Sequence, residues 1–145
     1  MSRARKLLAV VVTAGQRGDS PQFSSVLERI RVARVGGGRP RTRPELVVAD
    51  RACTSTANRF YLRRRGIRAC IPSKAGQDAH RRTKGSKGGR PPAFDLVSCR
   101  LRHAVECGIN LLKHNRGMAT RYDKLAVRYE AVVIIAAINE WLAAL

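Results

Sequence analysis

The stretch "LVVADRACTSTANRFYLRRRGIRACI", residues 46–71, decides the fold of this chain. Its first four residues, Leu46 to Ala49, form an apolar run that is typical of a short buried strand. Residues 54–65 then offer a threonine or serine that can cap a helix, bulky side chains within the helix and a glycine directly after it. A further strand is predicted from Ile67 to Ile71. Strand, helix and strand in this order indicate an α/β fold.

Two more elements are predicted on the N-terminal side of this stretch. The run from Leu7 to Thr13 is apolar and rich in β-branched residues, which favours a buried strand. A helix is predicted from Pro21 to Val35, because apolar side chains recur there at helical spacing. The basic, glycine-rich residues 36–44 should form a loop that leads to the strand at Leu46.

On the C-terminal side, a long basic segment precedes two helices. Residues 73–92 carry six Lys and Arg and almost no large apolar side chain, so we expect a basic loop or arm that does not order itself alone. Helices are predicted from Leu96 to Asn115 and from Leu125 to Ala144, with a connection between them. We therefore expect residues 1–145 to form a single α/β domain with a helical C-terminal end.

The charge of the chain is its most unusual bulk property. Twenty-nine Lys and Arg against ten Asp and Glu give a net charge of +19 over 145 residues. Self-repulsion at this charge disfavours compaction, so we expect a polyanionic partner, of which nucleic acid is the commonest. A ribosomal protein, a DNA-binding enzyme and an RNA chaperone all fit this charge, which indicates the class of partner and not the reaction.

Two other classes of protein are disfavoured. The four cysteines lack the paired spacing of a zinc ribbon and the density of a secreted disulfide scaffold, so we expect free thiols in a reducing cytoplasm. The longest apolar run near the C-terminus, Ala131 to Ile138, is far shorter than the ~20 residues that span a bilayer. We therefore expect no membrane partner.

Glu106 lies near the middle of the helix predicted from Leu96, and two interpretations of it stay open. On a helical wheel it lies with Arg102 and Lys113 beside an apolar stripe that the helix should bury. That stripe consists of Leu101, Val105, Gly108 and Leu112. Spacing alone favours a surface ion pair with Arg102, four residues earlier. The other interpretation is that Glu106 holds a metal ion.

Asp50 strengthens the second interpretation. It follows the strand predicted from Leu46, and functional side chains gather at the carboxyl ends of strands in open α/β sheets. A role as a turn or capping residue is equally compatible with its position. Carboxylates at 50 and 106 could share Mg²⁺, which prefers oxygen ligands. Two such ions about 4 Å apart activate a water and stabilise a phosphate leaving group.

Several motifs resemble one protein family. Residues 99–113 read Cys99-x2-Arg102-x3-Glu106-x6-Lys113, which resembles the Y-x2-R-x3-E-x6-K signature of bacterial insertion-sequence transposases with a DDE catalytic triad. "ADRAC" at 49–53 resembles the "ADKAY" element that carries the second Asp of that triad. The stretches "GSKGGRPPAFD", "RGMATRYDKLA" and "VVVTAGQRGDSPQF" resemble the insertion-sequence-five group, within the insertion-sequence-four-like transposases. The resemblance covers nearly the whole chain.

The resemblance implies a ribonuclease-H-like catalytic core and cleavage and transfer of DNA strands that depend on Mg²⁺ or Mn²⁺. It makes Asp50 and Glu106 the second and third catalytic acids, and hence metal ligands. Arg102 and Lys113 are expected to contact DNA phosphate. The other basic residues expected to do so are Arg116, Arg81, Arg82, Lys84, Lys87 and Arg90. The implied partners are the insertion-sequence ends, the target DNA, and a second copy of the chain or an upstream transposase polypeptide. The implied location is the bacterial cytoplasm, at the nucleoid.

The sequence departs from the family pattern at several positions. Cys99 and Cys53 stand where the two motifs have Tyr, and Cys107 stands where Arg is usual. Gly108 replaces a larger residue, at a cost of about 1 kcal/mol of helix stability relative to alanine.

The first catalytic Asp of the family is the largest departure. It belongs to a strand upstream of the region that matches Leu7 to Thr13, and Asp19, the only acid in the first 27 residues, falls in a loop motif. We therefore expect an N-terminally truncated, C-terminal part of the catalytic domain that is inactive alone, because two of three carboxylates give an impaired two-ion site. The alternative is a non-enzymatic basic nucleic-acid-binding protein, in which Asp50 and Glu106 are structural acids.

Overall fold

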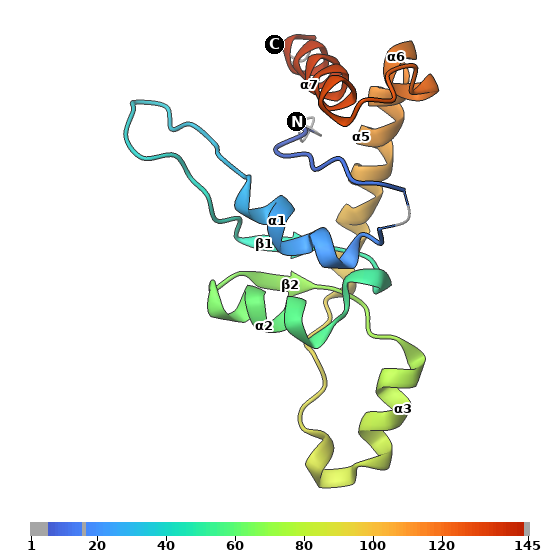
Figure 1. Ribbon diagram of the computed structural model, residues 1–145. Coiled ribbons are helices and arrows are strands. Elements are labelled where there is room, and N and C mark those ends of the chain that lie inside the picture. The colour runs from blue at the N-terminus through green and yellow to red at the C-terminus, as the bar shows by residue number, and fades with distance from the viewer. Residues whose placement is uncertain (1–5, 16, 144–145) are drawn as a thin grey trace. The chain divides into compact units, whose positions relative to one another are not determined.

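The computed structural model describes residues 6–15 and 17–143 (Figure 1). The chain falls into two compact units. The first unit takes residues 1–18, 25–42 and 103–145, and the second takes residues 19–24 and 43–102. Helices and a small sheet both occur, which is compatible with the predicted α/β class. The single domain expected for residues 1–145 stays a prediction.

The strand, helix and strand predicted for residues 46–71 are confirmed in the second unit. β1 (Leu46–Val48) and β2 (Arg68–Cys70) form a two-stranded parallel sheet, in which Val47 pairs with Ala69. α2 (Thr56–Arg64) joins the two strands, because parallel neighbours need a crossover connection (Figure 1).

α2 begins and ends where the sequence predicts. The Ser55 hydroxyl oxygen accepts a hydrogen bond from the backbone N–H of Asn58 at 3.1 Å and so caps the helix. Gly66 follows the helix with a φ of +65°, a left-handed conformation that glycine adopts without strain. Leu62 and Ile71, each 1% exposed, are the most buried large side chains described.

The basic segment 73–92 is more ordered than the sequence indicates. α3 (Ala75–Thr83) and the 3-10 helix η3 (Gly85–Gly88) occupy much of it. The expected loop therefore contains a helix. Apolar burial does not order this segment, since none of the residues of α3 and η3 is buried. Polar side chains tie α3 to the rest of the second unit instead.

The helix predicted from Leu96 to Asn115 is divided into three pieces. α4 (Leu96–Cys99) and the 3-10 helix η4 (Arg100–Arg102) belong to the second unit, and α5 (His103–Lys113) belongs to the first. The Asp95 carboxylate caps α4 by accepting hydrogen bonds from the Ser98 hydroxyl at 2.5 Å and the Val97 N–H at 2.9 Å. Both bonds lower the pKa of Asp95 below its ordinary value, and the bond from Ser98 has the larger effect.

The first unit packs α5 with α6 (Arg116–Thr120) and α7 (Ala126–Leu142). α7 confirms the last predicted helix. α6 lies in the connection between the two predicted helices, where no helix was predicted. The core of this unit consists of Leu112, Ala136 and Ala137, with Leu7 and Met118 packed against it. Gly117 allows α6 and α7 to approach closely, since a Cβ atom there would lie 3.3 Å from Cγ1 of Val132.

The strand predicted from Leu7 to Thr13 is not formed. Residues 7–13 are irregular chain, and the described residues supply no backbone ladder to them. A strand needs the backbone of a neighbour to pair with. In this structure the segment is held by side chains: Leu7 packs against the core, and the carbonyl of Val10 accepts a hydrogen bond from Arg29 at 2.8 Å.

The helix predicted from Pro21 to Val35 is shorter than expected. The 3-10 helix η1 (Ser20–Gln22) leads into α1 (Phe23–Glu28). Beyond it, Val32 forms an isolated antiparallel bridge with Arg41. The glycines at 36–38, with φ between 84° and 95°, reverse the chain between these two residues, so its arms pair and the helix cannot continue.

The apolar stripe predicted to be buried along η4 and α5 is covered only in its C-terminal half. Leu112 is 9% exposed, as predicted, but Leu101 is 40% and Val105 55% exposed. The prediction is wrong for these two residues: Leu101 belongs to η4 of the second unit, and the core of the first unit reaches α5 at Leu112, near its C-terminal end. None of the described helices is long and apolar enough to cross a membrane.

Candidate functional site

Asp50 lies two residues beyond the end of β1, at the carboxyl end of a parallel strand as predicted. It is exposed, and one of its carboxylate oxygens, Oδ1, accepts a hydrogen bond from the backbone N–H of Ala52 at 2.9 Å. Asp50 thereby caps the 3-10 helix η2 (Arg51–Cys53). The capping role that its position allowed is therefore real. A metal-binding role at the same carboxylate stays a prediction.

Cys53 stands beside Asp50 within the element that Asp50 caps. The pKa of the Cys53 thiol is raised above its ordinary value, mainly by burial. The negative charge of Asp50, a hydrogen bond to Asp50 and the negative charge of Asp19 raise it further, in that order. The thiol therefore stays protonated at neutral pH. A cysteine at this position places a neutral hydrogen-bonding group next to the carboxylate.

Glu106 lies in the first turn of α5, where a carboxylate is favoured by the helix dipole. Its side chain is 62% exposed, and Oε2 lies 3.5 Å from Nδ1 of His103, an ion pair when the imidazole is protonated. The ion pair anticipated with Arg102 is thus replaced by one with His103. At this exposure such a pair contributes little to stability.

The two proposed acids belong to different units, Asp50 to the second and Glu106 to the first. Among the residues that the structure describes, no group of three or more His, Cys, Asp or Glu is placed to hold a metal ion. Each carboxylate is exposed and so open to a hard cation. Their joint use as metal ligands rests on the motif.

Three of the predicted phosphate contacts flank Glu106 in sequence. Arg102 ends η4, Lys113 ends α5 and Arg116 begins α6, and all three are exposed. Exposure is what a phosphate contact requires, because the charge must meet the ligand without prior desolvation. The role of these residues stays a prediction.

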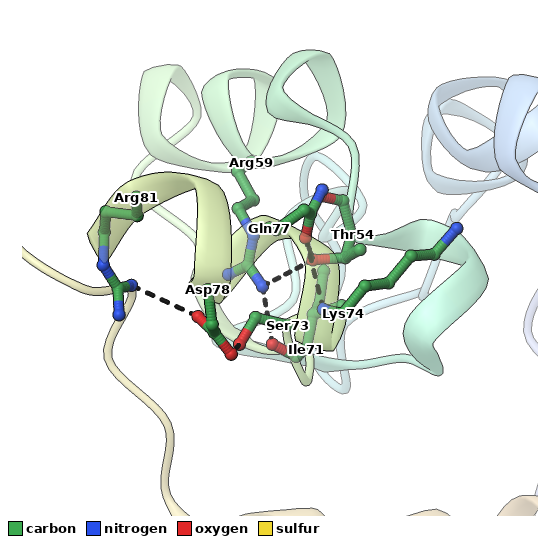
Figure 2. Close-up of polar contacts among 8 residues, drawn as sticks. All are labelled: Thr54, Arg59, Ile71, Ser73, Lys74, Gln77, Asp78 and Arg81. Atoms are coloured by element: carbon green, nitrogen blue, oxygen red, sulfur yellow. Dashed lines mark hydrogen bonds and ion pairs between the residues drawn. The ribbon is translucent and has the colours of Figure 1, made fainter. Parts of the chain in front are cut away.

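The other predicted phosphate contacts lie on and after α3, and they divide into two groups. Arg81 is half-buried and its Nη1 lies 3.3 Å from the carboxylate of Asp78 (Figure 2). An arginine already paired within the chain is less available to DNA. The remaining four are exposed: Arg82, Lys84, Lys87 and Arg90.

Polar side chains join α3 to α2 and to the chain beyond β2 (Figure 2). The Arg59 guanidinium donates to the Thr54 hydroxyl at 2.8 Å and to the carbonyl of Ile71 at 2.7 Å. The side-chain amide of Gln77, in α3, makes two hydrogen bonds with Thr54, each at 3.4 Å: its oxygen accepts from the Thr54 hydroxyl, and its nitrogen donates to the Thr54 carbonyl. Burial lowers the pKa of Arg59, and the negative charge of Asp78 opposes that shift.

Sequence reasoning missed this network. Asp78 was the available signal, because it is the only acid in residues 73–92. The members of the network come from separate parts of the chain, and the separation of 23 positions between Thr54 and Gln77 hides their contact from any local pattern.

Comparison with known proteins gives one positive result. A family model described as the transposase DDE domain matches residues 2–139. No curated protein and no solved structure matches the chain significantly. The match spans nearly all of the 145 residues and includes both proposed acids and the basic residues around them. The chain therefore belongs to the family of transposases that carry a DDE domain.

Proposed function

We propose that this chain carries part of a ribonuclease-H-like transposase core of the insertion-sequence-five group, which acts on the DNA of insertion-sequence ends and target. The observation that carries the proposal is the family match over residues 2–139. Within this range, the sequences around Asp50 and Glu106 resemble two family motifs that carry catalytic acids. The position of Asp50 at the carboxyl end of β1 supports it.

Asp50 and Glu106 are the residues that would hold Mg²⁺ or Mn²⁺. Their chemistry fits, since both are solvent-accessible carboxylates and these cations prefer oxygen ligands. The bound metal would supply an activated water and stabilisation of the phosphate leaving group. Arg102 and Lys113 bind and orient the phosphate backbone beside Glu106.

Two carboxylates alone predict little catalysis. Asp50 and Glu106 are the two acids of residues 1–145 that resemble the catalytic acids of the family motifs. We expect negligible strand transfer by this chain alone, because a two-ion site with two of three acids is severely impaired. Mg²⁺-dependent strand transfer by the purified chain that vanishes in Asp50→Asn would overturn this expectation.

A specific observation favours a second candidate, a non-enzymatic DNA-binding protein. Both acids have structural roles without a metal: Asp50 caps η2, and Glu106 pairs with His103. A salt-titrated DNA-binding assay with and without Mg²⁺ separates the two candidates. Under the transposase proposal Mg²⁺ changes the affinity of the wild type, and Glu106→Gln abolishes that change. Indifference to Mg²⁺ in both proteins favours the plain binder.

The proposed reaction also indicates partners and location. DNA is the substrate, and the proposed protein partner is a second copy of the chain or an upstream transposase polypeptide. The substrate places the chain in the bacterial cytoplasm, at the nucleoid. Size-exclusion chromatography with light scattering tests self-association: a concentration-dependent dimer supports the second copy, and a monomer at all concentrations argues against it.

A further inference from the structure

The basic segment after β2 is an ordered structure with an uneven distribution of charge. Residues 73–92 hold six Lys and Arg against the single acid Asp78, which gives the segment five net positive charges. Much of the segment is helical, in α3 and η3. A flexible basic tail would lose conformational entropy when it binds a polyanion, and an ordered one has already lost it on folding.

Two sets of hydrogen bonds fasten the N-terminal half of α3 (Figure 2). In the first set, Gln77 holds Thr54, and Thr54 is held in turn by Arg59. In the second, the Ser73 hydroxyl donates to Oδ2 of Asp78 at 2.7 Å, just before the helix begins. These contacts fix α3 to the strand–helix–strand core of the second unit.

Asp78 is the residue on which the second set depends. One of its carboxylate oxygens accepts from Ser73, and the other pairs with Arg81. Arg81 is therefore neutralised within the chain, in contrast to its exposed neighbour Arg82. The acid thus pairs one arginine within α3, whereas Arg82, Lys84, Lys87 and Arg90 are exposed.

η3 folds back closely on α3. A Cβ atom at Gly88 would lie 2.2 Å from the carbonyl oxygen of Arg81 and 2.9 Å from its Cγ, so only glycine fits there without a shift of the backbone. This close approach fixes the position of η3, which carries Lys87, relative to the end of α3, which carries Arg82. Arg82 in α3 and Lys87 in η3 are consequently presented by two short elements that approach closely, with Lys84 between the elements and Arg90 two residues after η3.

We infer that α3 and η3 form a preorganised module that binds the phosphate backbone of duplex DNA. Arg82, Lys84, Lys87 and Arg90 are its phosphate contacts, and Asp78 and Arg81 are positioning residues that contact no DNA. The inference rests on the proposal that the chain acts on DNA. It changes the expected role of Arg81, and it assigns a role in DNA binding to an acid.

The first test compares two pairs of exposed basic residues on matched elements. Arg82→Gln/Lys84→Gln removes two charges at the end of α3, and Arg63→Gln/Arg64→Gln removes two charges from the last turn of α2. The dissociation constant of the full chain for a labelled duplex is measured over a range of NaCl. The α3 pair should reduce the slope of log K against log salt by about 1.8, which is about 0.9 per lost phosphate contact. The α2 pair should leave that slope nearly unchanged.

The second test asks whether Asp78→Asn strengthens or weakens DNA binding. Asp78→Asn raises the net charge by one, so simple electrostatics predicts tighter DNA binding. Weakening of the bond from Ser73 and loss of the ion pair with Arg81 should instead loosen α3 and weaken binding several-fold. Asp19→Asn is the matched control, an equal change of charge at an exposed acid that caps no helix through its side chain. It should leave binding unchanged or slightly tighter.

A third measurement separates docking from global unfolding. Amide hydrogen exchange of residues 75–83 should accelerate in Asp78→Asn, while that of α2 stays as in the wild type. The double variant Arg81→Asp/Asp78→Arg restores the ion pair in reverse, and it should recover part of the lost affinity and protection.

Two outcomes have different meanings. If the wild-type chain binds duplex DNA without a dependence on salt, the proposed function itself fails. If the wild type binds with a clear salt slope, and the α3 pair and the α2 pair lower it equally, the module inference is overturned while the DNA-binding role stands. Tighter binding by Asp78→Asn would likewise overturn the positioning role.

Discussion

At the scale of single residues, Asp50 has one shown role and one proposed role, and two substitutions separate them. Asparagine retains an oxygen that can accept from Ala52, whereas alanine removes the cap. Asp50→Ala should lower the free energy of unfolding by about 1 kcal/mol, and Asp50→Asn by well under that. Both should lose metal binding equally. Urea unfolding measures the first quantity, and equal destabilisation by both variants would argue against the cap.

The pKa of the Cys53 thiol depends on the charge of Asp50. Burial and the carboxylate raise the pKa of the thiol, so its alkylation should reach half of its maximal rate at a higher pH than that of an exposed thiol. Asp50→Asn removes one of these causes and should move the curve to lower pH. Burial is the largest cause and persists, so the pKa should stay above the ordinary value. Mass spectrometry of the Cys53 peptide after timed iodoacetamide treatment measures the rate, and an unmoved curve would contradict the contact.

At the scale of elements, α2 has a single side-chain cap that can be removed cleanly. Ser55→Ala deletes the hydroxyl that accepts from Asn58, and it should cost about 1 kcal/mol of unfolding free energy. Ser55→Asp keeps an acceptor and should retain most of the stability. Chemical denaturation followed by circular dichroism gives both values, and an alanine variant as stable as the wild type would show that the cap contributes nothing.

The elements also show how far the sequence predicts the structure. β1, α2 and β2 were predictable, because an apolar run, a cap and a glycine stop are local signals. The strand expected at residues 7–13 failed because a strand depends on a neighbour that local sequence does not reveal. α3 was missed for the same kind of reason, since its stabilising bonds come from residues such as Thr54 far earlier in the chain.

The candidate site was predictable to the same limited degree. The motif proposes Asp50 and Glu106 as catalytic acids, and the position of Asp50 after a strand also allowed the cap that the structure shows. It did not find the pairing of Glu106 with His103, because a histidine three residues away and an arginine four residues away satisfy helical spacing equally well. The docking role of Asp78 requires knowledge of the tertiary fold.

At the scale of the whole molecule, the net charge of +19 gives salt two opposite effects. Added NaCl screens self-repulsion, with a screening length of about 10 Å at 0.1 M, so the melting temperature of the free chain should rise between low and moderate salt. The same salt should weaken DNA binding. Differential scanning fluorimetry and fluorescence anisotropy over one salt series measure both. A melting temperature that falls with salt would show that self-repulsion does not limit stability.

The central claim is that Asp50 and Glu106 together hold a divalent metal in a chain that acts on DNA. Electron paramagnetic resonance of free Mn²⁺ during a titration measures that binding directly, without any need for activity. The wild type should remove Mn²⁺ from solution, Asp50→Asn and Glu106→Gln should each lose most of this binding, and the control Asp123→Asn should keep it. Equal Mn²⁺ binding by all four proteins, or none by the wild type, would contradict the claim.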